Sequence, residues 1–242
     1  MIKFTRYLLF VAILLAGITV NAQYDSSLGT WDIFLLKGNF SRKISFTGEF
    51  NMRATNFHST YNYSEYKFSL GYSLKHNLIV GAGTGGYNTS LTGSFLNTVP
   101  SQKEVRIWAE MLFKHSTGRF YFDHRVRVER RFMYIDNTNR LGYRLAINVP
   151  INKPLLSDNT VFFAISNETF LGQGNPTYEK NRFFLGAGYK LNDRFTFQLQ
   201  NLNQNDYKGS NIQCKNYLYL TIICNLPNKF KQEKKSDSIS TD

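Results

Sequence analysis

The residue types that most often do chemistry are few in this chain, and their spacing favours structure over catalysis. The glycine run at 81–86 matches the G-x-G-x-x-G pattern that binds dinucleotide pyrophosphates at the N-terminus of a helix. No helical pattern follows the run, because Asn88, Thr89, Ser90 and Gly93 come next. We therefore interpret these glycines as small residues on a strand, where they let neighbouring side chains pack closely.

Histidines and cysteines give little support for a metal site or a nucleophile. The four histidines lack metal-ligand spacing on a shared element. His124 lies between Phe122 and Val126 on an apolar face, with no serine among its expected neighbours, so we expect it to hydrogen-bond at a membrane interface. On one strand Cys214 and Cys224 would lie about 33 Å apart, so two free thiols are expected. The sequence predicts no catalytic residue, cofactor or metal.

Charged side chains recur at every second position of several segments, and their spacing is the most informative pattern in the chain. A period of two places such residues on one face of a β-strand. The set that we expect to face inward is Glu49, Glu104, Arg106, Trp108, Glu110, Arg125, Arg127, Glu129, Arg131, Arg140, Arg144, Glu168 and Arg182. These residue types form ion pairs, and an excess of arginine would favour anions.

Charge complementarity predicts a register for the hairpin around Thr117 and Gly118. If those two residues form the turn, the inward pairs are Glu110 with Arg125, Trp108 with Arg127, Arg106 with Glu129, and Glu104 with Arg131. Three of these pairs join opposite charges and one is a cation–π pair, each contributing roughly 0.2–1 kcal/mol. On the next strand, Arg144 is expected to reach Glu129 from the other side.

The elements that must position these residues are predicted to be β-strands. Alternation is clear in 43–53, 65–75, 104–114, 119–132, 139–149 and 181–191, and weaker in 28–36, 78–87, 160–170, 194–202 and 214–226. At about ten residues each, these segments exceed the ~5–6 residues of a typical soluble strand and suit a tilted transmembrane strand of ~9–11. The apolar face is rich in Tyr and Phe toward strand ends, as aromatic girdles are.

The connections are expected to alternate in length, as they do in outer-membrane barrels. The short ones would be 37–42, 76–77, 117–118 and 192–193, and the long ones 54–62, 88–103, 171–180 and 203–213. Eleven candidate strands are an odd number, whereas single-chain bacterial barrels have even numbers. We therefore expect either ten strands, with 28–36 outside the wall, or twelve.

Charge and the first residues together indicate the compartment. The chain has 242 residues, with 29 Lys and Arg against 17 Asp and Glu, and a net charge of +12. Residues 1–22 have the pattern of a secretory signal peptide, in which Lys3 and Arg6 precede an apolar run that ends near Ala22. Cleavage would remove both basic residues and lower the charge to +10. Export disfavours a nucleic-acid partner, and we expect a barrel domain over 23–227 and a polar tail over 228–242.

The charged segments resemble an uncharacterised bacterial family, the domain of unknown function 2490. The most specific match is Arg-Val-Arg-Val-Glu-Arg-Arg-Phe at 125–132, supported by 49–53, 104–108, 140–144, 167–170 and 181–189. The resemblance covers essentially the whole mature chain. It implies an outer-membrane β-barrel, inserted by the barrel-assembly machinery, with no established activity to carry over. Many such barrels end on an aromatic residue, whereas here Leu226 precedes a polar tail.

The sequence thus predicts an all-β fold, an antiparallel up-and-down transmembrane β-barrel of 10–12 strands with a charged lumen. Its expected location is the outer membrane of a Gram-negative bacterium, in contact with outer-membrane lipid. The expected role is structural, or that of a narrow, porin-like pore or binding barrel largely plugged by side chains. The sequence does not identify a small-molecule or anion ligand. Two alternatives remain: an enzyme that modifies lipid or lipopolysaccharide, and a soluble periplasmic lipocalin-like binding barrel.

Overall fold

The structure is a computed structural model that describes residues 24–90, 100–174, 176–209, 211–227 and 230. In these ranges the strands are β1 (Tyr24–Asn39), β2 (Ile44–Asn56), β3 (Ser59–Lys75), β4 (Leu78–Thr89), β5 (Gln102–Thr117), β6 (Phe120–Met133), β7 (Asn137–Pro150), β8 (Thr160–Gly172), β9 (Tyr178–Lys190), β10 (Phe195–Lys208) and β11 (Asn211–Asn225). The predicted signal peptide and nearly all of the predicted tail lie outside the described residues. None of the described segments is a helix long and apolar enough to cross a membrane.

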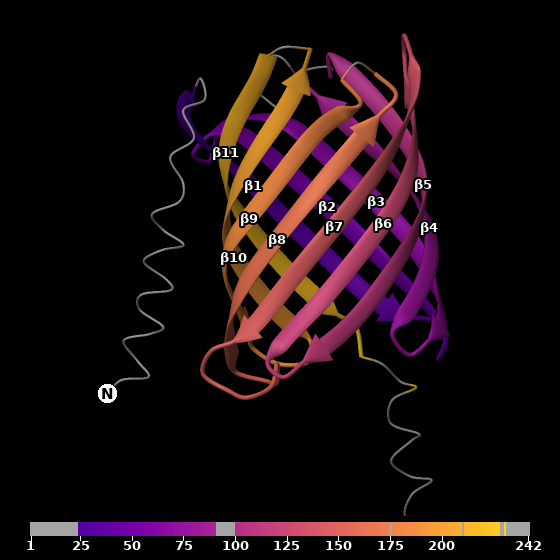
Figure 1. Ribbon diagram of the computed structural model, residues 1–242, viewed down its shortest axis with the longest axis vertical. Helices are drawn as coiled ribbons and strands as arrows, with labels where there is room; N and C mark the ends of the chain where they lie inside the picture. The colour runs from indigo at the N-terminus through magenta and orange to yellow at the C-terminus, as the bar shows by residue number, and fades with distance from the viewer. Residues whose placement is uncertain (1–23, 91–99, 175, 210, 228–229, 231–242) are drawn as a thin grey trace, which may run out of the picture.

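The strands form a closed barrel in which consecutive strands pair antiparallel (Figure 1). The barrel closes through parallel pairing of β1 with β11, in unbroken register from Leu28 opposite Asn216 to Lys37 opposite Asn225. An odd number of strands makes this closure necessary, because the first and last strands of an up-and-down barrel then point the same way. The all-β, up-and-down barrel is confirmed. The expected ten or twelve strands are corrected to eleven, and the segment 28–36 belongs to the wall.

The connections do not alternate in length as predicted. At the end drawn uppermost in Figure 1, Phe57 and His58 alone join β2 to β3, and β10 ends only three residues before β11 begins. The predicted long loops at 54–62 and 203–213 are therefore mostly strand. At the lower end, residues 151–159 form a long connection between β7 and β8. Strand ends that carry polar residues on both faces lose the alternating pattern, which is why the sequence indicated loops there.

The two faces of the wall differ sharply in chemistry. On β3, the alternate residues from Tyr66 to Leu74 are apolar and exposed on the outer surface. Their neighbours Glu65 and Lys67 point into the barrel. Outward apolar residues of the same kind recur on the other strands, so the apolar face predicted from the sequence is the outer surface.

An aromatic cluster that the sequence did not predict fills one side of the interior. Trp31, Phe184, Leu202 and Tyr217 are buried together, with Ile33 beside them. The Trp31 ring meets the Tyr217 ring edge-on, with centroids 5.8 Å apart. The strands β1, β9, β10 and β11 supply this cluster, whereas the charged side chains come mostly from β2 to β9.

The glycines of β4 make room for inner side chains. A Cβ added at Gly83 would collide with the Trp108 ring, and one at Gly85 would lie 2.8 Å from Cγ of Lys67. The run belongs to the extended strand β4. The interpretation of these residues as sites of close packing is therefore confirmed, and the dinucleotide pattern lacks the helix that it needs.

Candidate functional site

The interior holds a cavity of about 650 Å³. Its lining reaches from Thr89 and Gln102 at the upper end of the barrel to Asn148 and Lys190 at the lower end. Every side chain that the sequence predicted for the lumen lies in this lining. The basic residues of the lining are Lys37, Arg53, Lys67, Arg106, Lys114, Arg125, Arg127, Arg131, Arg140, Arg144, Lys180, Arg182 and Lys190, and the acidic ones are Glu49, Glu65, Glu104, Glu110, Asp123, Glu129 and Glu168. Thirteen basic groups against seven carboxylates make the cavity basic.

Near the upper end, glutamates and arginines of β5, β6 and β7 form a dense group of ion pairs. The Glu104 carboxylate accepts hydrogen bonds from Arg106 Nε at 2.6 Å and from Arg131 Nε at 2.5 Å. The Glu129 carboxylate accepts from Arg140 Nη2 at 2.6 Å, and both of these side chains are buried. Two-pronged contacts of this kind hold a guanidinium in one orientation.

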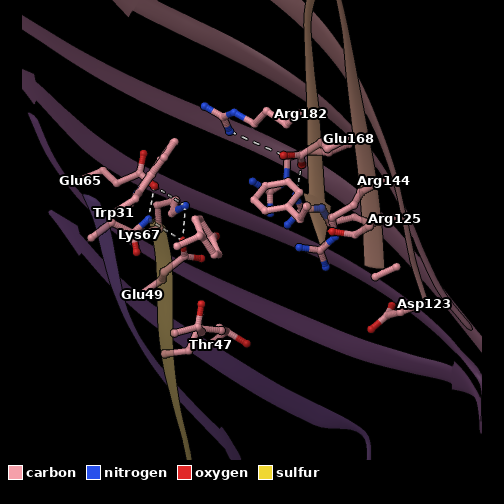
Figure 2. A pocket seen from close by; sticks show the side chains of 18 of the residues that line it. Trp31, Thr47, Glu49, Glu65, Lys67, Asp123, Arg125, Arg144, Glu168 and Arg182 are labelled. Atoms are coloured by element: carbon pink, nitrogen blue, oxygen red, sulfur yellow. Dashed lines mark hydrogen bonds and ion pairs between the residues drawn. The ribbon is translucent and has the colours of Figure 1, made fainter. Parts of the chain in front are cut away.

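A second group lies on β2 and β3, where two carboxylates share one ammonium (Figure 2). Lys67 Nζ lies 2.5 Å from Glu49 Oε1 and 2.7 Å from Glu65 Oε1. Neutral donors add to these contacts. Tyr63 donates its hydroxyl proton to Glu65 Oε2 at 2.7 Å, and Asn51 Nδ2 donates at 2.7 Å to Glu49 Oε1, the oxygen that Lys67 also contacts. With two carboxylates and one ammonium this group keeps a net negative charge, and its short contacts are all made within the group.

The β5–β6 hairpin differs from its predicted register by two residues. The turn consists of Gly118 and Arg119, so Thr117 faces Phe120 and Glu110 faces Arg127. Gly118 has a φ of +56°, and a two-residue hairpin turn favours such a φ at its first central position. The predicted turn at 117–118 would have placed Thr117 there. The conformational demand of the turn sets the register, not the charges.

Most of the predicted charge partners nevertheless meet, along diagonals of the sheet. The diagonal contacts are Trp108 with Arg127 at 4.7 Å, Arg106 with Glu129 at 3.8 Å, and Glu104 with Arg131 at 2.5 Å. The predicted pair of Glu110 with Arg125 is not formed, because Glu110 binds Arg127 at 2.7 Å. A long side chain can contact either the residue directly opposite or the residue two positions along the neighbouring strand. Complementary charges therefore cannot distinguish the two registers.

Three arginines surround the single carboxylate of Glu168. Arg125 donates to Glu168 Oε1, and Arg182 Nη1 lies 3.6 Å from Glu168 Oε2. Arg144 faces Arg125 on one side and Glu168 on the other in the strand register, and Figure 2 shows it next to both. The Nε atom of Arg144 is buried without a hydrogen-bond partner. The predicted contact between Arg144 and Glu129 is wrong, because Arg140 of the same strand lies opposite Glu129.

Two histidines, His124 and His58, make contacts outside the lumen, and none of their side-chain contacts in the described residues is with a serine. His124 Nδ1 lies 2.9 Å from the Tyr143 hydroxyl, on the outward face of β6 and β7. His58, in the β2–β3 turn, lies 3.0 Å from the Tyr61 hydroxyl and 3.6 Å from Asp32 Oδ2. The sequence did not indicate the contact between His58 and Asp32, because these residues are far apart along the chain and are brought together by the pairing of β1 with β2.

Both cysteines are free and lie on β11, as predicted. Within the described ranges, no three His, Cys, Asp or Glu side chains are grouped as metal ligands would be.

The fold and the site define a class of protein: a closed, up-and-down, eleven-stranded barrel with an apolar outside and an ion-paired interior. The sequence profile of a family described as "Protein of unknown function (DUF2490)" matches residues 28–215, from β1 to the start of β11. The chain belongs to this family, so the resemblance is confirmed. Neither the curated proteins nor the solved structures that were compared with the chain gave a match.

Proposed function

We propose that the protein is an outer-membrane β-barrel whose lumen is narrowed to a small basic cavity that binds or admits small anionic solutes. The observation that carries this proposal is the sorting of side chains between the two faces of the wall, with apolar residues outside and charges inside. In water, this arrangement would expose a broad apolar surface on many strands. In a bilayer, the same surface contacts lipid, while the charges stay in the lumen.

The dimensions of the wall also support the membrane proposal. The strands have 12 to 17 residues, enough for a tilted strand to cross a hydrocarbon core of about 30 Å. Closure through β1 and β11 pairs the backbone groups that an open sheet would expose to lipid. The signal-peptide pattern of residues 1–22 favours export, as an outer-membrane protein of a Gram-negative bacterium requires.

The lumen combines a structural role with a limited capacity for solutes. Buried arginine–carboxylate pairs and the aromatic cluster occupy much of the interior and tie strands together. The remaining cavity is lined by aromatic and apolar residues on one side and by charged groups with a basic excess on the other. Such a space suits small anions better than large or cationic solutes.

Cell fractionation tests the location. After expression in a Gram-negative host, we expect the protein in the outer-membrane fraction, extracted by detergent, and migrating differently on a gel before and after heating. Recovery in the soluble periplasmic fraction would contradict the proposal and favour a lipocalin-like barrel.

A pair of variants makes the same test more specific. Leu70 lies on the outer surface of β3 and is 45% exposed. Arginine at a lipid-facing position costs about 2–4 kcal/mol near the bilayer midplane. Leu70→Arg should therefore reduce the folded, membrane-inserted fraction, whereas Leu70→Met should not. A soluble barrel would tolerate both changes.

A further inference from the structure

We propose that the lumen contains a specific binding site for a small oxyanion, a carboxylate or a phosphate group, centred on Arg144 with Lys37 as its second cation. The inference deepens the proposed function, because it names the ligand class and the groups that bind it. It rests on that proposal only in requiring that solutes reach the lumen.

The first argument is the local imbalance of charge. Arg125, Arg144 and Arg182 surround Glu168, so three positive charges share one negative charge. Arg125 and Arg182 take the two carboxylate oxygens, and Arg182 also donates to Gln204 Oε1 at 2.8 Å. Arg144 is left without a counter-ion.

The second argument is that other carboxylates of the cavity lining already have partners. The committed pairs are Glu110 with Arg127 at 2.7 Å, Asp123 with Lys114 at 3.3 Å and Glu49 with Lys67 at 2.5 Å. A carboxylate that turned toward Arg144 would give up the short contact that it now makes, although Lys67 would keep Glu65 at 2.7 Å and Arg127 would keep Glu129 at 3.6 Å. Because thirteen basic groups and seven carboxylates line the cavity, such a turn would move the basic excess and not remove it.

The third argument is a second cation that lacks an ion pair. Lys37, on the parallel-paired strand β1, lines the same cavity as Arg144. The charges of Arg144 and Lys114 act on it, as do the more weakly coupled carboxylates of Asp123 and Glu49. In the described part of the chain, neither Lys37 nor Arg144 has a side-chain hydrogen bond or an ion pair. An unpaired charge taken out of bulk water is costly, and a bound anion removes that cost.

The chemistry of the guanidinium indicates the kind of anion. A guanidinium presents parallel N–H donors in a planar fork, which match two oxygens of a carboxylate or phosphate. The Nε of Arg144 is one such donor, and it is buried without a partner. A halide would satisfy the charge but would not use the fork.

Intrinsic fluorescence offers a direct test of binding. The chain has two tryptophans, Trp31 and Trp108, and both line the cavity. The purified full-length barrel in detergent would be titrated with inorganic phosphate, acetate or chloride at constant ionic strength. We expect a saturable change in fluorescence with phosphate or acetate. The anion that binds more tightly shows whether the site prefers a phosphate group or a carboxylate. A response to chloride equal to that of both oxyanions would overturn the proposal.

Variants assign the response to the site. Loss of a charge-assisted fork should weaken oxyanion binding about tenfold or more in Arg144→Gln, with Arg144→Lys intermediate. Arg130 lies on the outward face of β6, so Arg130→Gln is the matched control and should bind like the wild type. Lys37→Gln provides a second weakening variant, and heat modifiability verifies that each protein is folded. Wild-type affinity in folded Arg144→Gln and Lys37→Gln would refute the site. Because the titration uses purified barrel, its outcome is independent of the fractionation that tests membrane location.

Discussion

At the scale of single residues, the interior pairs most of its charges at short range. Glu104 and Glu129 accept from arginines of neighbouring strands, and Glu168 accepts from Arg125 of β6, two strands away. All three carboxylates are nearly inaccessible to solvent. Removing one partner of such a pair leaves an uncompensated buried charge, which costs more than the pair contributes when intact. The members of this network should therefore differ in their response to substitution according to whether a partner remains.

Glu168 and Arg144 should respond in opposite ways to loss of charge. Glu168→Gln leaves three clustered arginines without a counter-ion and should lower the free energy of unfolding by about 3–5 kcal/mol. Arg144→Gln removes a repelled cation and should leave stability unchanged or raise it. Unfolding in urea, followed by tryptophan fluorescence in detergent, measures both.

The Lys114–Asp123 pair supplies the control for that comparison. Lys114 is 52% exposed and its ammonium lies 3.3 Å from Asp123. Exposed pairs contribute below about 1 kcal/mol, so Lys114→Gln should have a small effect. Equal losses in Arg144→Gln and Glu168→Gln would mean that Arg144 is an ordinary paired member of the network.

At the scale of elements, the alternating pattern was sufficient to locate the strands but not to predict how they pair with one another. The eleven alternating segments all became strands, and their apolar faces became the outer surface. The register around Gly118 was wrong because diagonal contacts satisfy the same charges in two registers. The closure was missed because parallel pairing of β1 and β11 joins the two ends of the chain and leaves no mark in either segment alone.

The parallel closure can be tested with a native cysteine. Leu36 of β1 lies opposite Cys224 of β11, and both belong to the outward face. In Leu36→Cys, a short thiol-specific crosslinker should therefore join β1 to β11 within one chain. A crosslinked chain can be detected by peptide mass spectrometry.

Two comparisons exclude non-specific crosslinking. Leu36→Cys combined with Cys224→Ser should give no β1–β11 product. Phe34→Cys faces Ile222, two residues from Cys224, and should react less well with a short reagent. Absence of the product in Leu36→Cys alone would favour a barrel that leaves β1 outside the wall.

At the scale of the whole molecule, the interior is divided into an aromatic side and a charged side. Trp31 and the aromatic cluster lie inside β1 and β9–β11, whereas Trp108 lies within the charged group on β5 and β6. The two tryptophans thus report on different sides of one cavity. The basic excess of the lining should make both sides more accessible to anions than to cations.

Collisional quenching of tryptophan fluorescence can test separately whether solutes enter the lumen and whether the lumen prefers anions. Acrylamide is neutral, so quenching by it should show that small solutes reach Trp31 and Trp108. Iodide should then quench severalfold more efficiently than caesium at equal ionic strength, because thirteen basic groups and seven carboxylates line the cavity. The Lys37→Gln and Arg144→Gln double variant removes two unpaired cations and should reduce the difference between iodide and caesium quenching.

If acrylamide quenches but iodide and caesium act equally, the basic lining does not select anions. If none of the three quenches the folded barrel, the lumen is closed to solutes and the network serves only to stabilise the wall.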